Sequence, residues 1–263
     1  MRIRNLTKTI LIIYILLTTY NLVSLFIGIP YLPFFTPLLT LIAFVFALLH
    51  GSQNLGWRQT LLLLLLTFAI SLLFESVGVA TGWVYGPYHY TDKLGPKFLG
   101  LVPLLIPVAW FMMTYPSYII AKHLMPVQKS TWVWRIVASA LGALVMTSWD
   151  LAMDPMMAAG GYWVWEQPGA YFGVPLQNYW GWWLTTFVTF LLFLSLARIK
   201  PEPDSSNGSF TRLAVASFAT TGLSSVVVNF VFGLNGPGLV GIFAMLPWVV
   251  MGFFEPAKRA SND

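Results

Sequence analysis

The hydrophobic positions of this chain gather into eight long stretches that are separated by short polar segments. A membrane-spanning α-helix needs about 17–25 predominantly apolar residues, and each of these stretches has that length. The pattern therefore predicts an all-α protein, a polytopic bundle of about eight membrane-spanning helices in one integral membrane domain over residues 1–263. The expected spans are 9–28, 34–50, 59–80, 101–122, 132–153, 179–198, 212–233 and 238–255.

The composition supports this class. Hydrophobic residues make up 57% of the chain, charged residues make up 9%, and the mean hydropathy is +0.74, which together exclude an ordinary soluble domain. The net charge of +5 does not indicate a nucleic-acid partner, because membrane proteins carry Lys and Arg on their cytoplasmic loops for topological reasons. The chain has no cysteine, so disulfides, thiolate catalysis and iron–sulfur ligation are excluded.

The basic residues predict how the bundle is oriented in the cell membrane. If the N-terminus is cytoplasmic, all of the 14 basic residues except Lys93 and Lys97 fall on the cytoplasmic side. This asymmetry predicts that both termini are cytoplasmic, in agreement with an even number of spans. The residues assigned to the cytoplasmic side are Arg2, Arg4, Lys8, Arg58, Lys122, Lys129, Arg135, Arg198, Lys200, Arg212, Lys258 and Arg259.

Three acidic residues lie where a membrane protein tolerates charge poorly. Glu75 is deep in the third span, where an ionised carboxylate costs at least about 2.5–3.5 kcal/mol. Asp150 and Asp154 close the fifth span at i, i+4 spacing, which places both on one helical face. Two adjacent buried carboxylates do not both ionise cheaply, so we expect one to hold a proton. Pro155 predicts that this helix ends near Asp154, and the orientation places all three acids toward the outer end.

The two longest outer loops, 81–100 and 154–178, are rich in aromatic residues. Simpler interpretations remain open for these features and for the acids. A buried Glu can serve only to bridge neighbouring helices, and an Asp before a proline can serve only to cap a turn. Single Trp or Tyr residues are common in the interfacial belt of membrane proteins. The loop aromatics are Trp83, Tyr85, Tyr88, Tyr90, Phe98, Tyr162, Trp163, Trp165, Tyr171 and Phe172.

The sequence predicts no metal centre and no cofactor. The three histidines fall far apart, with His50 and His123 inside and His89 outside, so no His cluster is expected. The Asp150/Asp154 pair resembles half of a magnesium–diphosphate site, but a second Asp-rich motif and enough outer basic residues are missing. No His-supported nucleophile and no phosphate or dinucleotide loop is found. The buried acids and the aromatic residues suit a different chemistry, in which a protonated carboxylic acid protonates an alkene and aromatic faces stabilise the resulting tertiary carbocation.

The motifs resemble those of the membrane carotenoid 1',2'-hydratases of the CruF type. The resemblance covers about residues 70–185 and is carried by two groups of residues. The first is Glu75-x-x-Gly78-x-x-Thr81-Gly82-x-x-Tyr85-Gly86-x-Tyr88-x-Tyr90, followed by Val102-Pro103, Pro107 and Trp110. The second is Asp150-x-x-x-Asp154-Pro155, Trp163-x-Trp165 and Gly169-x-Tyr171-x-Gly173-Val174-Pro175-x-x-Asn178-x-x-Gly181-Trp182.

The resemblance implies addition of water across the terminal 1',2' double bond of an acyclic ψ-end group, on lycopene, γ-carotene or a C50 relative such as bisanhydrobacterioruberin. Our hypothesis is that Glu75 or one Asp of the pair protonates C2'. A second carboxylate, with Asn178, holds the water that attacks C1'. The expected substrate-binding wall consists of Trp83, Tyr85, Tyr88, Trp110, Trp163, Trp165, Tyr171 and Trp182.

Two alternatives remain open at this point. A carotene cyclase or isomerase would use the same protonation and end the cation by ring closure or proton loss. A proton-coupled transporter would use Glu75 and Asp150 as carriers, but such proteins often show internal repeats, and none is found. The expected partners are a carotenoid taken from the bilayer, membrane lipid and other enzymes of the carotenoid pathway, with no nucleic acid.

Overall fold

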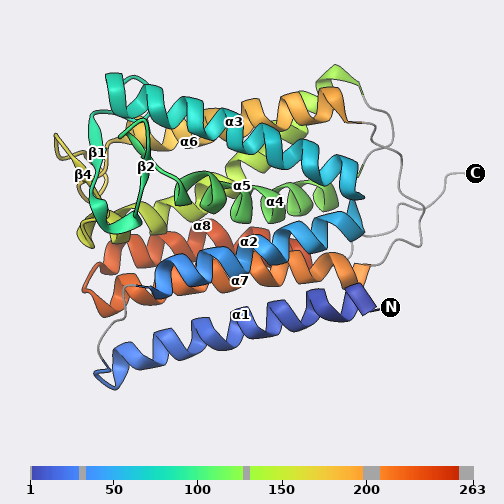
Figure 1. Ribbon diagram of the computed structural model, residues 1–263, viewed down its shortest axis with the longest axis horizontal. Helices are drawn as coiled ribbons and strands as arrows, with labels where there is room; N and C mark the ends of the chain where they lie inside the picture. Colours follow the sequence, from blue (N-terminus) through green and yellow to red (C-terminus); the bar gives the residue numbers. More distant parts are fainter. Residues whose placement is uncertain (1, 30–33, 127–130, 198–207, 255–263) are drawn as a thin grey trace, which may run out of the picture.

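The computed structural model describes residues 2–29, 34–126, 131–197 and 208–254. Within these ranges the chain forms a bundle of eight long helices that lie roughly side by side (Figure 1), which confirms the predicted fold class. The helices are α1 (Arg2–Phe26), α2 (Phe35–Asn54), α3 (Trp57–Thr81), α4 (Leu105–Leu124), α5 (Trp132–Ala159), α6 (Leu176–Leu196), α7 (Gly208–Val231) and α8 (Asn235–Phe253).

Helix α4 is the centre of the bundle. It contacts α2, α3, α5, α7 and α8, and most of its residues from Ile106 to Ala121 are buried. Seven of the helices in the described ranges, all except α4, are long and apolar enough to cross a membrane. In α4, Trp, Tyr, Pro and hydroxyl residues interrupt the aliphatic ones. A helix that is surrounded by protein does not need a uniformly lipid-compatible surface.

The end of α5 differs from the prediction. The sequence predicts that Pro155 ends this helix near Asp154, but α5 continues through Pro155 to Ala159. A proline inside a helix cannot donate to the carbonyl four residues earlier, which here belongs to Leu151. The Tyr171 hydroxyl donates to that carbonyl at 2.9 Å. We call the loops 81–100 and 154–178, which the sequence predicts on the outer side, the outer loops. The second of them supplies the hydrogen bond that Pro155 removes, and the helix carries Asp154 within a regular turn.

The outer loops form short strands that the all-α prediction does not include. Strand β1 (Tyr88–Tyr90) pairs antiparallel with β4 (Trp163–Trp165), and β2 (Lys97–Phe98) pairs with β3 (Val102–Pro103). They cover the end of the bundle opposite the N-terminus of α1 (Figure 1). Because β3 occupies 102–103, α4 begins at Leu105 rather than at the predicted residue 101.

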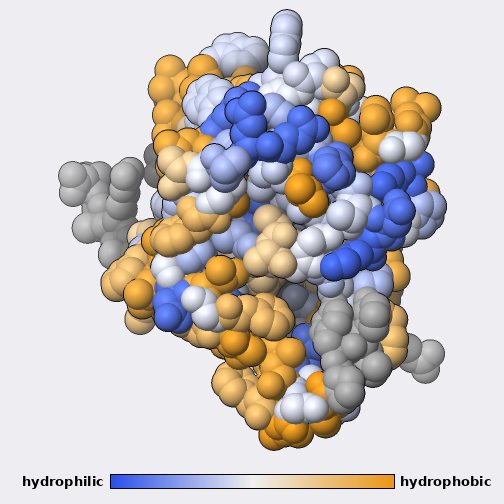
Figure 2. All heavy atoms as spheres, turned by 90° about the vertical axis from the view of Figure 1, so that its left-hand side faces the viewer, coloured by the Kyte–Doolittle hydropathy of each residue, from blue (hydrophilic) through white to orange (hydrophobic). Residues whose placement is uncertain are grey.

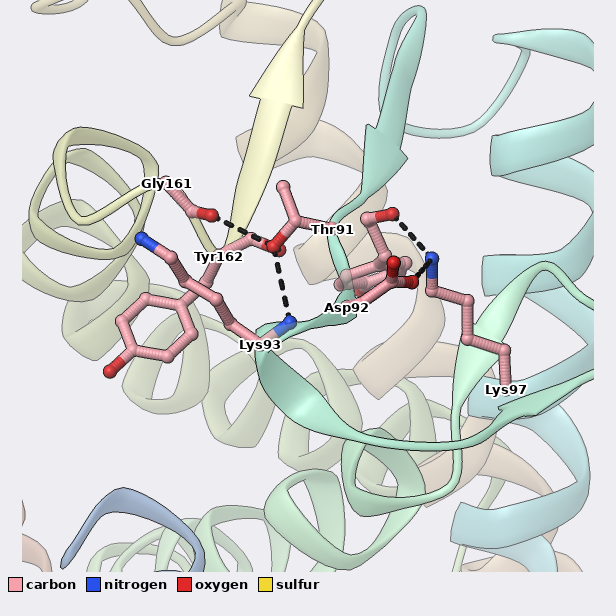
Figure 3. A network of polar contacts seen from close by, with 7 residues as sticks. Thr91, Asp92, Lys93, Lys97, Gly161 and Tyr162 are labelled. Carbon is pink, nitrogen blue, oxygen red and sulfur yellow. Dashed lines mark hydrogen bonds and ion pairs between the residues drawn. The ribbon is translucent and has the colours of Figure 1, made fainter. Parts of the chain in front are cut away.

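Hydrogen bonds connect the loop after β1 to the residues that follow α5 (Figure 3). The Thr91 hydroxyl donates to the Gly161 carbonyl at 2.8 Å, and Lys93 Nζ donates to the Gly160 carbonyl at 2.6 Å. Lys97 forms an ion pair with Asp92 at 2.9 Å on the exposed side of the same loop. The strand that carries Tyr88 and Tyr90 is therefore held at a fixed position relative to the acidic end of α5.

The predicted orientation in the membrane stays a prediction. Five of the basic residues assigned to the cytoplasmic side lie outside the described residues: Lys129, Arg198, Lys200, Lys258 and Arg259. The end of the molecule that carries the strands, seen face on in Figure 2, shows hydrophilic residues over its upper part and mainly hydrophobic residues over its lower part, toward α1.

Candidate active site

Glu75 lies in the last turns of α3 and is buried, with 3% of its surface exposed. Its Oε2 atom accepts hydrogen bonds from the Tyr88 hydroxyl and, at 2.9 Å, from the Tyr90 hydroxyl. Its Oε1 atom accepts from Trp110 Nε1 at 3.0 Å. Both oxygens of this carboxyl are thus occupied by donors from the outer loop and from α4.

Tyr88 and Tyr90 reach the same carboxyl because side chains two positions apart in a strand point to the same face. Both are buried, whereas His89 between them is exposed. Burial, followed by the nearby Glu75, raises the pKa of Tyr88 and of Tyr90 well above the ordinary value, so both phenols stay protonated and act as donors. The sequence hypothesis does not include Tyr90 among the site residues. The alternation of Tyr88 and Tyr90 is the signal that points to it.

Asp150 and Asp154 lie on one face of α5, as their spacing predicts. Asn178 of α6 bridges them, because its Nδ2 atom donates to Asp150 Oδ2 at 2.9 Å and to Asp154 Oδ2 at 2.8 Å. The second oxygen of Asp150 is buried and has no hydrogen-bond partner in the described part of the chain. The pair therefore contains one carboxyl oxygen that no donor from these residues satisfies.

The other oxygen of Asp154 accepts from two indoles. Trp163 Nε1 donates to Asp154 Oδ1 at 2.9 Å and Trp165 Nε1 donates to it at 3.1 Å. Both indoles come from β4, again two positions apart on one strand face. The β1–β4 pairing places Tyr88 opposite Trp165 and Tyr90 opposite Trp163. One small sheet thus supplies the phenols that hold Glu75 and the indoles that hold Asp154.

A cavity of about 600 Å³ is lined by these carboxyls and by other residues of the helices and outer loops. Glu75 and Asp154 are on its wall, and so is Asn178. Trp110 and Trp182 stack with ring centroids 4.2 Å apart, and Trp149 meets Trp182 edge-on at 5.9 Å. The sequence-predicted wall residues that line the cavity are Tyr85, Tyr88, Trp110, Trp163, Trp165 and Trp182.

Three predicted site residues are not on this wall. Asp150 is completely buried behind the Asn178 bridge. Trp83 is 82% exposed, because Gly82 ends α3 in a left-handed conformation and the chain turns outward there. Its backbone carbonyl accepts from the Gln177 side chain. The Tyr171 hydroxyl donates to the Leu151 carbonyl, and burial raises the pKa of this phenol to about 12.

Helices α1 and α7 add wall residues that belong to no motif found in the sequence. Tyr14 and Thr221 line the cavity and share a hydrogen bond of 2.8 Å between their hydroxyls. Ser225 also lines it and accepts from Trp149 Nε1 at 3.1 Å. Hydroxyl residues in apolar spans are common, so only the three-dimensional arrangement identifies these. Lys93 is on the wall as well, with its Nζ atom 5.7 Å from the centre of the Tyr162 ring.

In the described ranges, the acidic and His side chains form no group of three or more that is arranged to hold a metal ion. The site offers instead two wall carboxyls from different helices, each held by aromatic N–H or O–H donors. Such an arrangement can exchange protons with an apolar molecule in the cavity while stacked indoles face it.

Comparison with known proteins gives the family. A family model described as carotenoid biosynthesis protein matches residues 35–247. A curated relative from Haloarcula japonica, named bisanhydrobacterioruberin hydratase, is 36% identical over 146 residues, which are 56% of this chain and 48% of the relative. The match thus spans about half the length of that relative. No solved structure matches. The family match extends beyond the region of the motifs and confirms the resemblance: the chain belongs to the family of carotenoid biosynthesis proteins.

Proposed function

We propose that this protein is a carotenoid hydratase that adds water across the terminal 1',2' double bond of an acyclic ψ-end group. The observation that carries the proposal is the pair of wall carboxyls, Glu75 and Asp154, on an aromatic-lined cavity inside a membrane bundle. The relative from Haloarcula japonica, which is named a hydratase of a carotenoid, supports it. The expected substrates are lycopene, γ-carotene or a C50 relative that enters from the bilayer.

The hydrogen bonds favour different roles for the two carboxyls. Glu75 receives donors on both oxygens, and hydrogen bonds to a carboxylate favour its ionised form. Asp154 also receives donors on both oxygens, but it shares the Asn178 amide with Asp150, whose second oxygen has no donor among the described residues. Two adjacent buried carboxyls do not both ionise cheaply, so this pair has room for a proton. We therefore assign proton donation to the Asp pair through Asp154, and water activation to Glu75.

The proposed reaction has two steps and a reset. Asp154 transfers a proton to C2' of the alkene, and the π electrons form the new C–H bond, which leaves a tertiary cation at C1'. Water attacks C1', and Glu75 takes the proton that the water loses. Return of this proton to the Asp pair resets the site, so one water is consumed and no electron is gained or lost. The reaction is redox-neutral and needs no cofactor for electron transfer.

The stacked indoles have a role in the cationic step. Trp110 and Trp182 line the cavity, and an aromatic face attracts a cation by about 2 kcal/mol or more when desolvated. Trp110 also donates to Glu75, so the wall that stabilises the cation is connected to the group that activates water. In the predicted orientation the site lies toward the non-cytoplasmic side, where water reaches the outer loops.

Expression in bacteria that accumulate lycopene tests the proposal, with the extracted pigments analysed by mass. A hydratase adds the mass of one water to the carotenoid at each modified end. A cyclase or isomerase leaves the mass unchanged, and a transporter leaves the pigment itself unchanged. The experiment is repeated with γ-carotene and with bisanhydrobacterioruberin, because the sequence does not specify chain length. Unchanged pigment with all three substrates, in cells that contain the folded protein, contradicts the proposal.

A further inference from the structure

We propose that Tyr171 and Asn229 are positioning residues that brace the acid-bearing turn of α5 and so set the place of Asp154 on the cavity wall. The inference rests on the proposed function for its kinetic readout only. Neither residue lines the cavity, so neither is expected to touch the substrate. Both donate to backbone carbonyls that lie between Asp150 and Asp154 in the sequence.

The first brace arises from Pro155. In a regular helix the N–H of residue 155 would donate to the Leu151 carbonyl, and proline has no N–H. Without a donor to this partly buried carbonyl, the turn that holds both acids would lack one of its hydrogen bonds. The Tyr171 hydroxyl donates to this carbonyl at 2.9 Å. The outer loop therefore fixes the conformation of the turn at the position where the helix lacks its own bond.

The loop that carries Tyr171 is itself held firmly. Bridges pair Gly169 with Gly173 and Tyr171 with Val174 in a tight hairpin, and Phe172 at its tip has a φ of +48°. A Cβ atom added at Gly169 would clash with the backbone of Val174, so only glycine fits there. At the start of α8, a Cβ atom at Gly236 would clash with the Phe172 ring, so the tip packs closely against that helix.

The second brace comes from α7. Asn229 is fully buried, and its Nδ2 atom donates to the Ala152 carbonyl at 2.7 Å and to the Ser225 carbonyl at 2.8 Å. The Asp154 turn is thus held by two elements, the outer loop and α7. The side-chain donors to Asp154 come from Trp163, Trp165 and Asn178, none of which lies on α5. The geometry of these hydrogen bonds therefore depends on where the turn is held.

Tyr171→Phe is the direct test, because it removes the hydroxyl and keeps the ring. We expect kcat to fall by about tenfold to a hundredfold while KM changes by less than about twofold. Displacement of the Asp154 carboxyl slows the chemical step, whereas the residues that bind the substrate stay in place. Tyr179→Phe is the matched control. The Tyr179 ring lies 5.0 Å from that of Tyr171, but its buried hydroxyl has no partner among the described residues. This control should keep the rate of the unmodified protein.

The double variant Pro155→Ala/Tyr171→Phe gives the sharpest test. The alanine introduced by Pro155→Ala supplies an N–H that donates to the Leu151 carbonyl in a regular helix, so it replaces the bond lost with the hydroxyl. We expect the double variant to recover most of the rate lost in Tyr171→Phe. If Tyr171 only packs its ring against α5, Tyr171→Phe loses no rate; if the loss arises from anything other than the bond to Leu151, Pro155→Ala restores nothing. Asn229→Leu is a further variant on the second brace, and it should lower kcat in the same manner.

A readout without activity separates this inference from the proposed function. The indole N–H signals of Trp163 and Trp165 in an NMR spectrum of the detergent-solubilised protein report their bonds to Asp154. Tyr171→Phe should shift both signals, Tyr179→Phe should shift neither, and the double variant should restore them. If the signals respond in this way but the unmodified protein makes no hydrated product, the positioning holds and the proposed function fails. If the signals stay fixed in Tyr171→Phe, or if they shift while kcat is unchanged, the positioning inference is overturned.

Discussion

The two ends of the bundle each bury a polar cluster, and the clusters differ in how completely their atoms are paired. Toward the N-terminal end of α1, the ring of His50 on α2 is fully buried and stacks on Phe210 at 4.2 Å. Its Nε2 atom lies 2.8 Å from the Phe210 carbonyl, and its Nδ1 atom lies 2.5 Å from the Tyr115 hydroxyl. Because a carbonyl only accepts, Nε2–H donates, and the Tyr115 hydroxyl donates to Nδ1 in the neutral ring.

The acidic cluster at the other end is built differently. Glu75 and Asp154 face a cavity, and Asp150 keeps an oxygen without a partner in the described part of the chain. His50 and Tyr115 do not line that cavity, and both nitrogens of His50 have partners. A closed polar cluster joins helices, whereas a cluster that opens onto a cavity and retains an unpaired atom can exchange a proton with a ligand. Burial alone does not separate the two cases.

The largest expected effect follows from removing a wall carboxyl. Glu75→Gln and Asp154→Asn keep the side-chain shape and remove the ability to exchange a proton. Each should lower the rate of hydrated product by about a hundredfold to ten-thousandfold, the usual contribution of general acid–base catalysis. Product formation per folded protein in membranes checks this. Full activity in both variants would show that the open cluster is not the reactive one.

Trp110→Phe should have the next largest effect. It keeps an aromatic ring beside Trp182 and removes the N–H that donates to Glu75. A hydrogen bond to a charged group contributes about 1.5–3 kcal/mol, so kcat should fall by roughly tenfold to a hundredfold. Turnover at saturating substrate is the measurement. An unchanged kcat would show that the hydrogen bond from Trp110 to Glu75 does not contribute to the reaction.

His50→Leu should affect stability and leave the chemistry intact. The Tyr115 hydroxyl would lose its partner in a buried site, which costs about 1–3 kcal/mol. The thermal unfolding midpoint in detergent should fall, while the rate per folded molecule stays that of the unmodified protein. A large loss of rate with no loss of stability would place the closed cluster in the reaction and remove the contrast between the two ends.

The smallest effect is expected at Trp83. Its side chain is mostly exposed, and its backbone carbonyl, which accepts from Gln177, is present in any variant. Trp83→Ala should change the rate by less than about twofold, as is usual for surface substitutions away from special features. Comparison with Trp110→Phe in the same assay checks it. A loss at Trp83 as large as at Trp110 would mean that a surface indole takes part in binding.

The apolar stretches predict the eight helices well, and the i, i+4 spacing correctly places Asp150 and Asp154 on one face. The sequence does not predict that α5 continues through Pro155, because the compensating donor, Tyr171, lies 16 positions later and is brought near by the fold. It predicts Glu75, Tyr88 and Trp110 as site residues but not that Tyr88, Tyr90 and Trp110 all donate to the Glu75 carboxyl. The pairing between β1 and β4 decides which loop aromatics turn inward. The sequence predicts both Trp83 and Trp110 as substrate-binding residues, but Trp83 is exposed because the chain turns outward at the left-handed Gly82.

The origin of the oxygen in the product tests the proposed hydration most directly. Membranes that contain the protein are supplied with an acyclic carotenoid in water labelled with heavy oxygen, and the extracted pigment is analysed by mass. We predict a product that has gained one labelled water per modified end, and no such product from a Glu75→Gln/Asp154→Asn double variant. A product of unchanged mass, or labelled product formed equally well by the double variant, would contradict the proposed hydration at these two carboxyls.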